Sequence, residues 1–196
     1  MSEPVVILPT ATANLASVLA AFARLGAPTR VAREPAEVRD AERVVLPGVG
    51  TFGATMAGLR AAGLDAAIAE RARSGAPVLA MCVGLQVLFE ASDESPGEGL
   101  GVLSGRVGRF PPAVRVPQFG WNRIEPEPGC RYLEPGHAYF ANSFRILAAP
   151  GCKVARAEHG QSFVAAIERG PLLACQFHPE LSGAFGHRLI ARWLEG

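Results

Sequence analysis

The order of apolar segments along the chain predicts an α/β fold built on a mostly parallel sheet that is flanked by helices. Residues 4–8, 43–46 and 76–81 are short apolar runs, as expected of strands that are buried on both faces. Segments with apolar residues at helical spacing lie between them, the clearest at residues 14–25 and 51–59. Alternation of strand and helix at this spacing is typical of parallel strands with helices on both sides.

Glycines mark the ends of these elements and indicate where a site would lie. The helix at residues 14–25 is followed by Gly26, which can end a helix, and the strand at 43–46 runs into the glycine-rich turn 47–50. In open parallel sheets the functional site lies at the carboxyl ends of the strands. We therefore expect this turn and Cys82 to meet at one edge. A second helical pattern follows the turn region, at residues 64–73.

The second half of the chain predicts an added region of antiparallel strands. Residues 92–136 are rich in Gly, Pro and charge, with strand candidates at 102–109 and 121–124. No repeat, low-complexity tract or linker interrupts the chain, so we expect one domain over residues 1–196. The later expected elements are strands at 138–147, 154–157, 162–168 and 172–177 and a helix at 184–194.

Charge and apolar run length argue against two classes of partner. The 196 residues include 19 Lys and Arg against 18 Asp and Glu, and the basic residues are scattered, so we expect neither nucleic acid nor a membrane surface as a partner. Every apolar stretch is interrupted before it could span a bilayer. The first residues lack the basic segment of a signal peptide, so we expect a cytoplasmic protein.

Cys82 stands out because of its position at a predicted strand-to-helix turn. It follows the apolar run 76–81 and precedes the apolar segment 83–89, which predicts a helix. The positive end of a helix favours a thiolate. The small neighbours Ala80 and Gly84 suit the strained turn of a nucleophile elbow. Taken alone, a buried cysteine is more often a small core residue.

His178 and Glu180 supply the other groups that thiol chemistry needs. His178 ends the apolar run 172–177 and could take the proton of Cys82, while Glu180 could accept a hydrogen bond from the imidazole. A lone histidine at a strand end is commonly structural, but this one has a carboxylate two residues away. The three histidines without such a companion are His137, His159 and His187. The set points to acyl-transfer chemistry, with the turn 47–50 as a candidate oxyanion site.

No metal and no cofactor is expected. The cysteines show no CxxC spacing of the kind found in zinc sites and dithiol centres. Apart from Cys82 they are interpreted as structural or incidental thiols, reduced in a cytosol: Cys130, Cys152 and Cys175.

Two motifs resemble those of the class I glutamine amidotransferases. The segment AMCVGLQ at residues 80–86 is similar to the Gly-x-Cys-x-Gly-x-Gln of that family, and QFHPE at 176–180 matches its ending. The resemblance implies a flavodoxin-like sheet and L-glutamine as the substrate. It also implies a Cys82–His178–Glu180 triad.

Four segments resemble one branch of this family, the glutaminase subunits of imidazole glycerol phosphate synthase, which act in histidine biosynthesis. They are LPGVGTF at 46–52, VGLQVLFE at 83–90, VPQFGWN at 116–122 and YFANSFR at 139–145. The Pro-x-x-Gly-Trp-Asn element is the most discriminating. The resemblance implies a heterodimer with a (β/α)₈-barrel cyclase subunit that consumes the ammonia.

The resemblance also assigns residues around the triad. Backbone N–H groups near Val49, Gly50 and Val83 would hold the oxyanion. Gly50 would also help to position glutamine, together with Gln86, Asn142 and Ser143. Aromatic and polar character in segments beside the site indicates a partner-facing rim, which would consist of Trp121, Asn122 and Tyr139.

The chain departs from the pattern of this branch at four positions. Ala80 stands where glycine is usual, Gln118 and Asn142 where histidine is common, and Leu181 where a lysine is thought to face the partner. Two alternatives remain at this level. One is a glutaminase subunit for anthranilate, aminodeoxychorismate or pyridoxal phosphate synthesis, against which the Pro-x-x-Gly-Trp-Asn element argues. The other is a non-catalytic binding module on the same fold, which would be expected to have lost a triad member.

Overall fold

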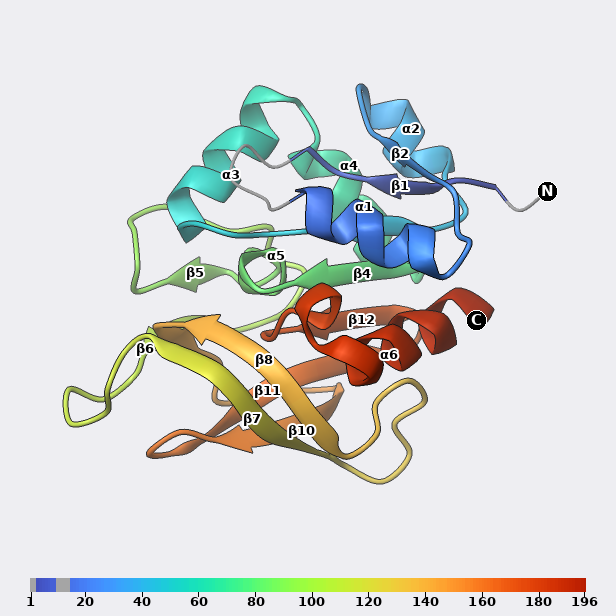
Figure 1. Ribbon diagram of the computed structural model, residues 1–196. Coiled ribbons are helices and arrows are strands. Elements are labelled where there is room, and N and C mark those ends of the chain that lie inside the picture. The colour runs from blue at the N-terminus through green and yellow to red at the C-terminus, as the bar shows by residue number, and fades with distance from the viewer. Residues whose placement is uncertain (1–2, 10–14) are drawn as a thin grey trace.

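A nine-stranded sheet forms the centre of the computed structural model, which describes residues 3–9 and 15–196 (Figure 1). Five neighbouring strands are parallel and bury apolar side chains on both faces over most of their length. In sheet order they are β2 Thr29–Val31, β1 Val5–Ile7, β3 Val44–Leu46, β4 Val78–Met81 and β12 Leu172–Cys175.

The sheet continues from β12 as four antiparallel strands. In sheet order they are β11 Ser162–Arg169, β10 Lys153–Glu158, β7 Gln118–Pro126 and β8 Gly136–Asn142. A smaller sheet lies beside them, formed by β5 Ala91–Ser92, β6 Arg106–Arg109 and β9 Phe144–Arg145. The predicted α/β class, with a largely parallel sheet and added antiparallel strands, is confirmed.

Helices cover both faces of the parallel strands, and the alternation of strand side chains divides the core in two. Val44 and Leu46 pack into the cluster beneath α2, α3 and α4, whereas Val45 between them packs beneath α1 and α6. Figure 1 shows α1 and α6 together on one side of the sheet. The bounds are α1 Leu15–Arg24, α2 Pro35–Asp40, α3 Phe52–Ala61, α4 Asp65–Ser74 and α6 Gly183–Glu195.

Two short elements, β2 and α2, were not predicted from the sequence. The side chains of β2 are only half-buried at the sheet edge, so they carry no clear apolar pattern. The helix α2 is six residues long and begins at Pro35, with a capping box between Glu34 and Glu37. The helix predicted from Asn14 corresponds to α1, and Asn14 itself lies outside the described residues.

The helix predicted over residues 83–89 is wrong in length, because α5 covers only Val83–Gln86. Beyond it, backbone carbonyls accept hydrogen bonds from a later segment instead of continuing the helix. Leu88 accepts from the N–H groups of both Val102 and Leu103, at 2.8 and 2.9 Å. Long-range pairing therefore overrides the local helical pattern.

The single strand predicted over residues 138–147 is also wrong, because it divides between two sheets. β8 ends at Asn142 and β9 begins at Phe144, where the chain leaves the large sheet and pairs with β6. The Asn142 amide donates to the Phe144 carbonyl oxygen at 2.9 Å and holds this bend.

The parallel register brings the carboxyl ends of three strands together. Leu46 of β3 pairs with Ala80 of β4, and Cys175 of β12 pairs with Met81 of β4. The chain segments that leave these strands therefore lie side by side at one edge of the sheet. None of the helices in the described residues has the length and apolar character required to cross a membrane.

Candidate active site

Cys82 occupies a strained backbone position between β4 and α5. Its φ and ψ are 52° and −112°, and it is the one residue other than glycine with a positive φ in the described part of the chain. Such a conformation costs about 1–3 kcal/mol and persists only where the surroundings impose it. Its N–H donates to the Cys175 carbonyl oxygen at 2.7 Å, and its own carbonyl accepts from Gln86 N–H at 3.2 Å.

Two glycines allow the turn after β3 to pack directly against the backbone of this elbow. A Cβ on Gly84 would lie 2.2 Å from the carbonyl oxygen of Leu46. A Cβ on Gly48 would lie 2.3 Å from the backbone nitrogen of Gly84. Neither neighbour can move without shifting the main chain, so both positions require glycine. Gly50 has a φ of 96°, which also favours glycine.

His178 is fixed by its backbone and by its imidazole ring. Its N–H donates to the Tyr139 carbonyl oxygen at 2.9 Å, which ties it to β8. Its Nδ1 lies 2.8 Å from Oε1 of Glu180, and both side chains are about 95% buried. The Ser182 hydroxyl donates to the His178 carbonyl at 2.6 Å and accepts from Tyr139 N–H at 3.0 Å. Ser182 is thus a positioning group that sequence reasoning missed.

The buried imidazole of His178 has a raised pKa. Burial alone would lower it, but hydrogen bonds and charge interactions with Cys82 and Glu180 outweigh burial and raise the pKa from 6.5 to about 10. With Nδ1–H directed at Glu180, the other ring nitrogen is left for the thiol. The arrangement favours an imidazolium beside a sulfur nucleophile.

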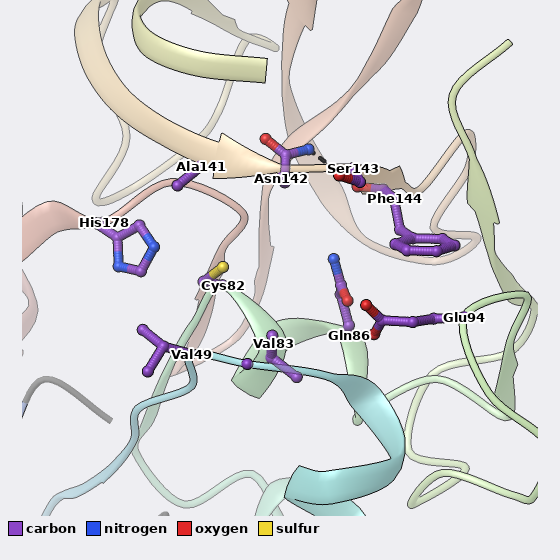
Figure 2. A pocket seen from close by; sticks show the side chains of 11 residues that line it. Val49, Cys82, Val83, Gln86, Glu94, Ala141, Asn142, Ser143, Phe144 and His178 are labelled. Carbon is purple, nitrogen blue, oxygen red and sulfur yellow. Dashed lines mark hydrogen bonds between the residues drawn. The ribbon is translucent and has the colours of Figure 1, made fainter. Parts of the chain in front are cut away.

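A cavity of about 200 Å³ opens over Cys82 and His178 (Figure 2). Its wall contains every residue that the sequence assigned to the oxyanion and glutamine-binding positions. These are Val49, Gly50, Val83, Gln86, Asn142 and Ser143. Glu180 does not line the cavity and lies behind the imidazole.

Glu94 is a wall residue that sequence reasoning missed. Its Oε2 accepts a 2.6 Å hydrogen bond from Phe52 N–H at the start of α3. Figure 2 shows the carboxylate directed towards the side of the pocket that holds Gln86. No other carboxylate lines this pocket in the described part of the chain. The loop carries no strand or helix pattern that could have indicated it. Ala141 and Phe144 complete the wall.

The amide of Asn142 is engaged within the chain, and its neighbour Gln118 is buried beside it. Figure 2 shows the Asn142 nitrogen directed towards Ser143, consistent with its bond to the Phe144 carbonyl. Gln118 pairs with Asn142 across β7 and β8. Both are about 95% buried, and neither amide atom of Gln118 has a hydrogen-bond partner among the residues that the structure describes. These two departures from the family pattern therefore lie next to each other.

The predicted rim residues divide between the two faces of the β7–β8 hairpin. Trp121 is 58% exposed and packs edge-on against Tyr139. Phe119, which the sequence analysis did not select, is 73% exposed and also contacts Tyr139. Asn122 instead donates to the Glu158 carbonyl at 2.8 Å and accepts from Arg123 N–H at 2.8 Å. Its amide thus holds the hairpin to β10.

The thiols of the other three cysteines lie in surroundings that favour the neutral form. Burial, with the charges of Glu168 and Glu127, raises the pKa of Cys130 to about 11. Burial also raises the pKa of Cys152 and of Cys175. No group of three or more His, Cys, Asp or Glu side chains in residues 3–9 and 15–196 could hold a metal ion.

Comparison with known proteins assigns the chain to a family. The model of the family described as glutamine amidotransferase class-I matches residues 11–195. The chain belongs to this family. The resemblance read from the Cys82 and His178 motifs is thereby confirmed.

Similar proteins include several with the same name. A protein of Symbiobacterium thermophilum, imidazole glycerol phosphate synthase subunit HisH, is 40% identical over 195 residues, covering 96% of this chain and 92% of the relative. The subunit of the same name from Leifsonia xyli is 41% identical and covers 99% of each chain.

Solved structures share the fold of this amidotransferase. A crystal structure of a glutamine amidotransferase aligns with a TM-score of 0.77 at 24% identity, covering 97% of each chain. The structure of PurLQS from Thermotoga maritima aligns with a TM-score of 0.75 at 18% identity and covers 99% of each chain. At these identities the likeness concerns the fold alone.

Replacement of Gly84 by alanine is predicted to disrupt the elbow. The added Cβ would meet the Leu46 carbonyl, so we expect Gly84→Ala to lower the free energy of unfolding by about 2–4 kcal/mol. Gly58→Ala in α3 is the matched control, because its Cβ would meet nothing within 4 Å and alanine favours a helix by about 1 kcal/mol. Urea unfolding measures both. Equal changes in the free energy of unfolding for Gly84→Ala and Gly58→Ala would contradict the close approach of Gly84 to the Leu46 carbonyl.

The pKa of His178 is predicted to depend on the thiol of Cys82. In Cys82→Ser the interactions of His178 with the sulfur are lost while burial remains, so we expect the pKa of His178 to fall by at least about one unit. NMR titration of the imidazole Cε1–H signal measures it. Cys175→Ala is the control, because that thiol lies in the core cluster on the other face of the sheet. An unchanged pKa in Cys82→Ser would refute the coupling.

Proposed function

We propose that this chain is the glutaminase subunit of an imidazole glycerol phosphate synthase. It hydrolyses L-glutamine to glutamate and ammonia and passes the ammonia to a (β/α)₈-barrel cyclase subunit, which makes imidazole glycerol phosphate and aminoimidazole carboxamide ribotide. The observation that carries the proposal is the buried contact series from Glu180 through His178 to Cys82, at the wall of a pocket of amino-acid size. The shared name of the relatives supports the pathway.

The first half of the reaction forms a thioester. The thiolate of Cys82 attacks the side-chain carbonyl carbon of glutamine, and the carbonyl oxygen becomes an oxyanion. Backbone N–H groups of Gly50 and Val83, with the peptide at Val49, stabilise that charge. His178 donates its proton to the departing nitrogen, and ammonia leaves.

The second half regenerates the thiol. The now neutral His178 takes a proton from a water molecule, which attacks the thioester carbonyl. The sulfur leaves and glutamate is released. Glu180 keeps the imidazole oriented through Nδ1 and stabilises it each time it becomes charged.

Charge in the pocket supports recognition of an amino acid. We assign Glu94 to the α-ammonium group of glutamine, because its carboxylate lies in the same wall as Gln86 and one oxygen remains after the bond to Phe52. Gln86 and the segment Asn142–Ser143 would hold the remaining polar groups of the substrate. That segment lines the cavity, and the bond from the Asn142 amide to the Phe144 carbonyl holds its bend.

Exposed apolar side chains near His178 in the chain and in β7 support docking of the cyclase. They are Phe119, Trp121 and Leu181, and Tyr139 contacts both aromatic rings. Aromatic clusters of this kind are enriched at the centres of protein interfaces. Leu181, which stands where the branch has lysine, makes this part of the contact apolar rather than ionic.

The deciding experiment measures glutamate release from glutamine by the purified chain, alone and with a bacterial cyclase subunit and its ribonucleotide ligand. We expect stimulation by the cyclase and loss of activity in Cys82→Ser of about 10⁴-fold or more. High activity without the cyclase, or none with it, would favour the glutaminase of another pathway. Full activity in Cys82→Ser would refute the triad.

Neutralising Glu94 is predicted to weaken substrate binding rather than catalysis. In Glu94→Gln an oxygen remains to accept from Phe52 N–H, so only the charge facing the α-ammonium is lost. We expect KM for glutamine to rise about 10–100-fold with kcat changed less than threefold. Glu98→Gln, an exposed residue of the same loop, is the control. A change in kcat with KM unchanged would contradict the assignment.

A further inference from the structure

Gln176 is a fully buried amide that the reaction as described does not use. It follows β12 directly, and its side chain is 0% exposed. Alternation along the extended chain places it on the same side as His178, two residues later, with the core residue Phe177 on the opposite side. A polar side chain at this depth requires partners.

Both ends of the Gln176 amide are engaged, and the partners are the nucleophile and a pocket residue. Nε2 of Gln176 donates to Sγ of Cys82 at 3.8 Å. Oε1 of Gln176 accepts a 3.0 Å hydrogen bond from Nε2 of Gln86. The series runs from the wall of the pocket, through a buried amide, to the sulfur atom.

The polarity of this series has a chemical consequence. Gln86 uses the carbonyl oxygen of Gln176, so the amino group of Gln176 is the end that faces the sulfur. An N–H donor stabilises a thiolate more than a thiol, because the hydrogen bond to the charged form is the stronger one. The Gln86 amide, in turn, is held in one orientation against the cavity.

We propose that Gln176 is a positioning residue that donates a hydrogen bond to the thiolate of Cys82 and fixes the amide of Gln86 against the substrate pocket. The inference rests on the proposed glutaminase function. The side chain of Gln176 would thus connect Gln86, which contacts the substrate, with Cys82, which attacks it. The charged or titratable groups around the sulfur are His178, Glu180 behind it and Glu94 across the pocket.

Two substitutions of Gln176 distinguish its hydrogen bond to Cys82 from its hydrogen bond with Gln86. Gln176→Glu keeps an oxygen for Gln86 but removes the donor that faces Cys82. Gln176→Met has a similar volume and removes both contacts. We expect the pH midpoint of Cys82 alkylation by iodoacetamide to rise by about one unit or more in both variants. We expect KM for glutamine to rise about tenfold in Gln176→Met and to change little in Gln176→Glu.

Alkylation is followed by mass spectrometry of the peptide that contains Cys82, between pH 5 and 10, so that other thiols do not contribute. Cys175→Ala is the matched control, because it alters the neighbouring strand position without touching either amide. Circular dichroism checks the fold. Because the new carboxylate of Gln176→Glu would itself oppose the thiolate, Gln176→Leu, which removes the donor without adding a charge, decides the question if Gln176→Met does not fold.

The outcomes separate this inference from the proposed function. An alkylation midpoint that is the same in wild type, Gln176→Glu and Gln176→Met overturns the role of Gln176, whatever the glutaminase rate. A midpoint that rises in both variants and not in Cys175→Ala supports it. If the wild type releases no glutamate with any cyclase, the proposed function fails, and the midpoints still test the hydrogen bond to the sulfur.

Discussion

The left-handed backbone at Cys82 is the constraint on which the site depends. A side chain at φ 52° is unfavourable, and it is held there because three parallel strands end side by side. The Cys82 N–H donates a hydrogen bond to the carbonyl oxygen of Cys175 in β12. The carbonyl oxygen of Leu46 in β3 lies so close to Gly84 that no side chain fits there. The same contact leaves the turn 47–50 directly against the elbow, so one packing contact places both Cys82 and the proposed oxyanion donors.

Buried polar groups at this edge form a connected set rather than isolated sites. Glu180, His178 and Cys82 make one series, and Gln86 with Gln176 makes another that ends at the same sulfur. Each member would be costly to bury alone, and the low dielectric around them strengthens every contact that is made. The positive charge of the His178 imidazolium is therefore stabilised, although burial of the ring opposes it.

The parallel core and the proximity of Cys82, His178 and Glu180 were predictable from sequence because both depend on local signals. Apolar runs such as 43–46 mark strands buried on two faces, and Cys82 and His178 carry short motifs at strand ends. Glu94 could not be found in this way, since a loop without a pattern brings it to the pocket through its bond to Phe52. The lengths of α5 and β8 were misjudged for the same reason, because hydrogen bonds to distant segments end them.

The antiparallel strand β8 joins the exposed aromatic surface to His178, the base in the proposed reaction. Tyr139 contacts the rings of Phe119 and Trp121 on the outer face, and its carbonyl accepts the N–H of His178 at 2.9 Å. A few residues further on, the same strand forms the pocket wall at Asn142. The proposed partner surface therefore lies on a strand that is one hydrogen bond from His178. β8 is the edge strand of the sheet, and two hydrogen bonds tie it to the segment 178–182: His178 N–H donates to the Tyr139 carbonyl, and Tyr139 N–H donates to the Ser182 hydroxyl. Tyr139 therefore joins the exposed aromatic surface to His178 through direct contacts.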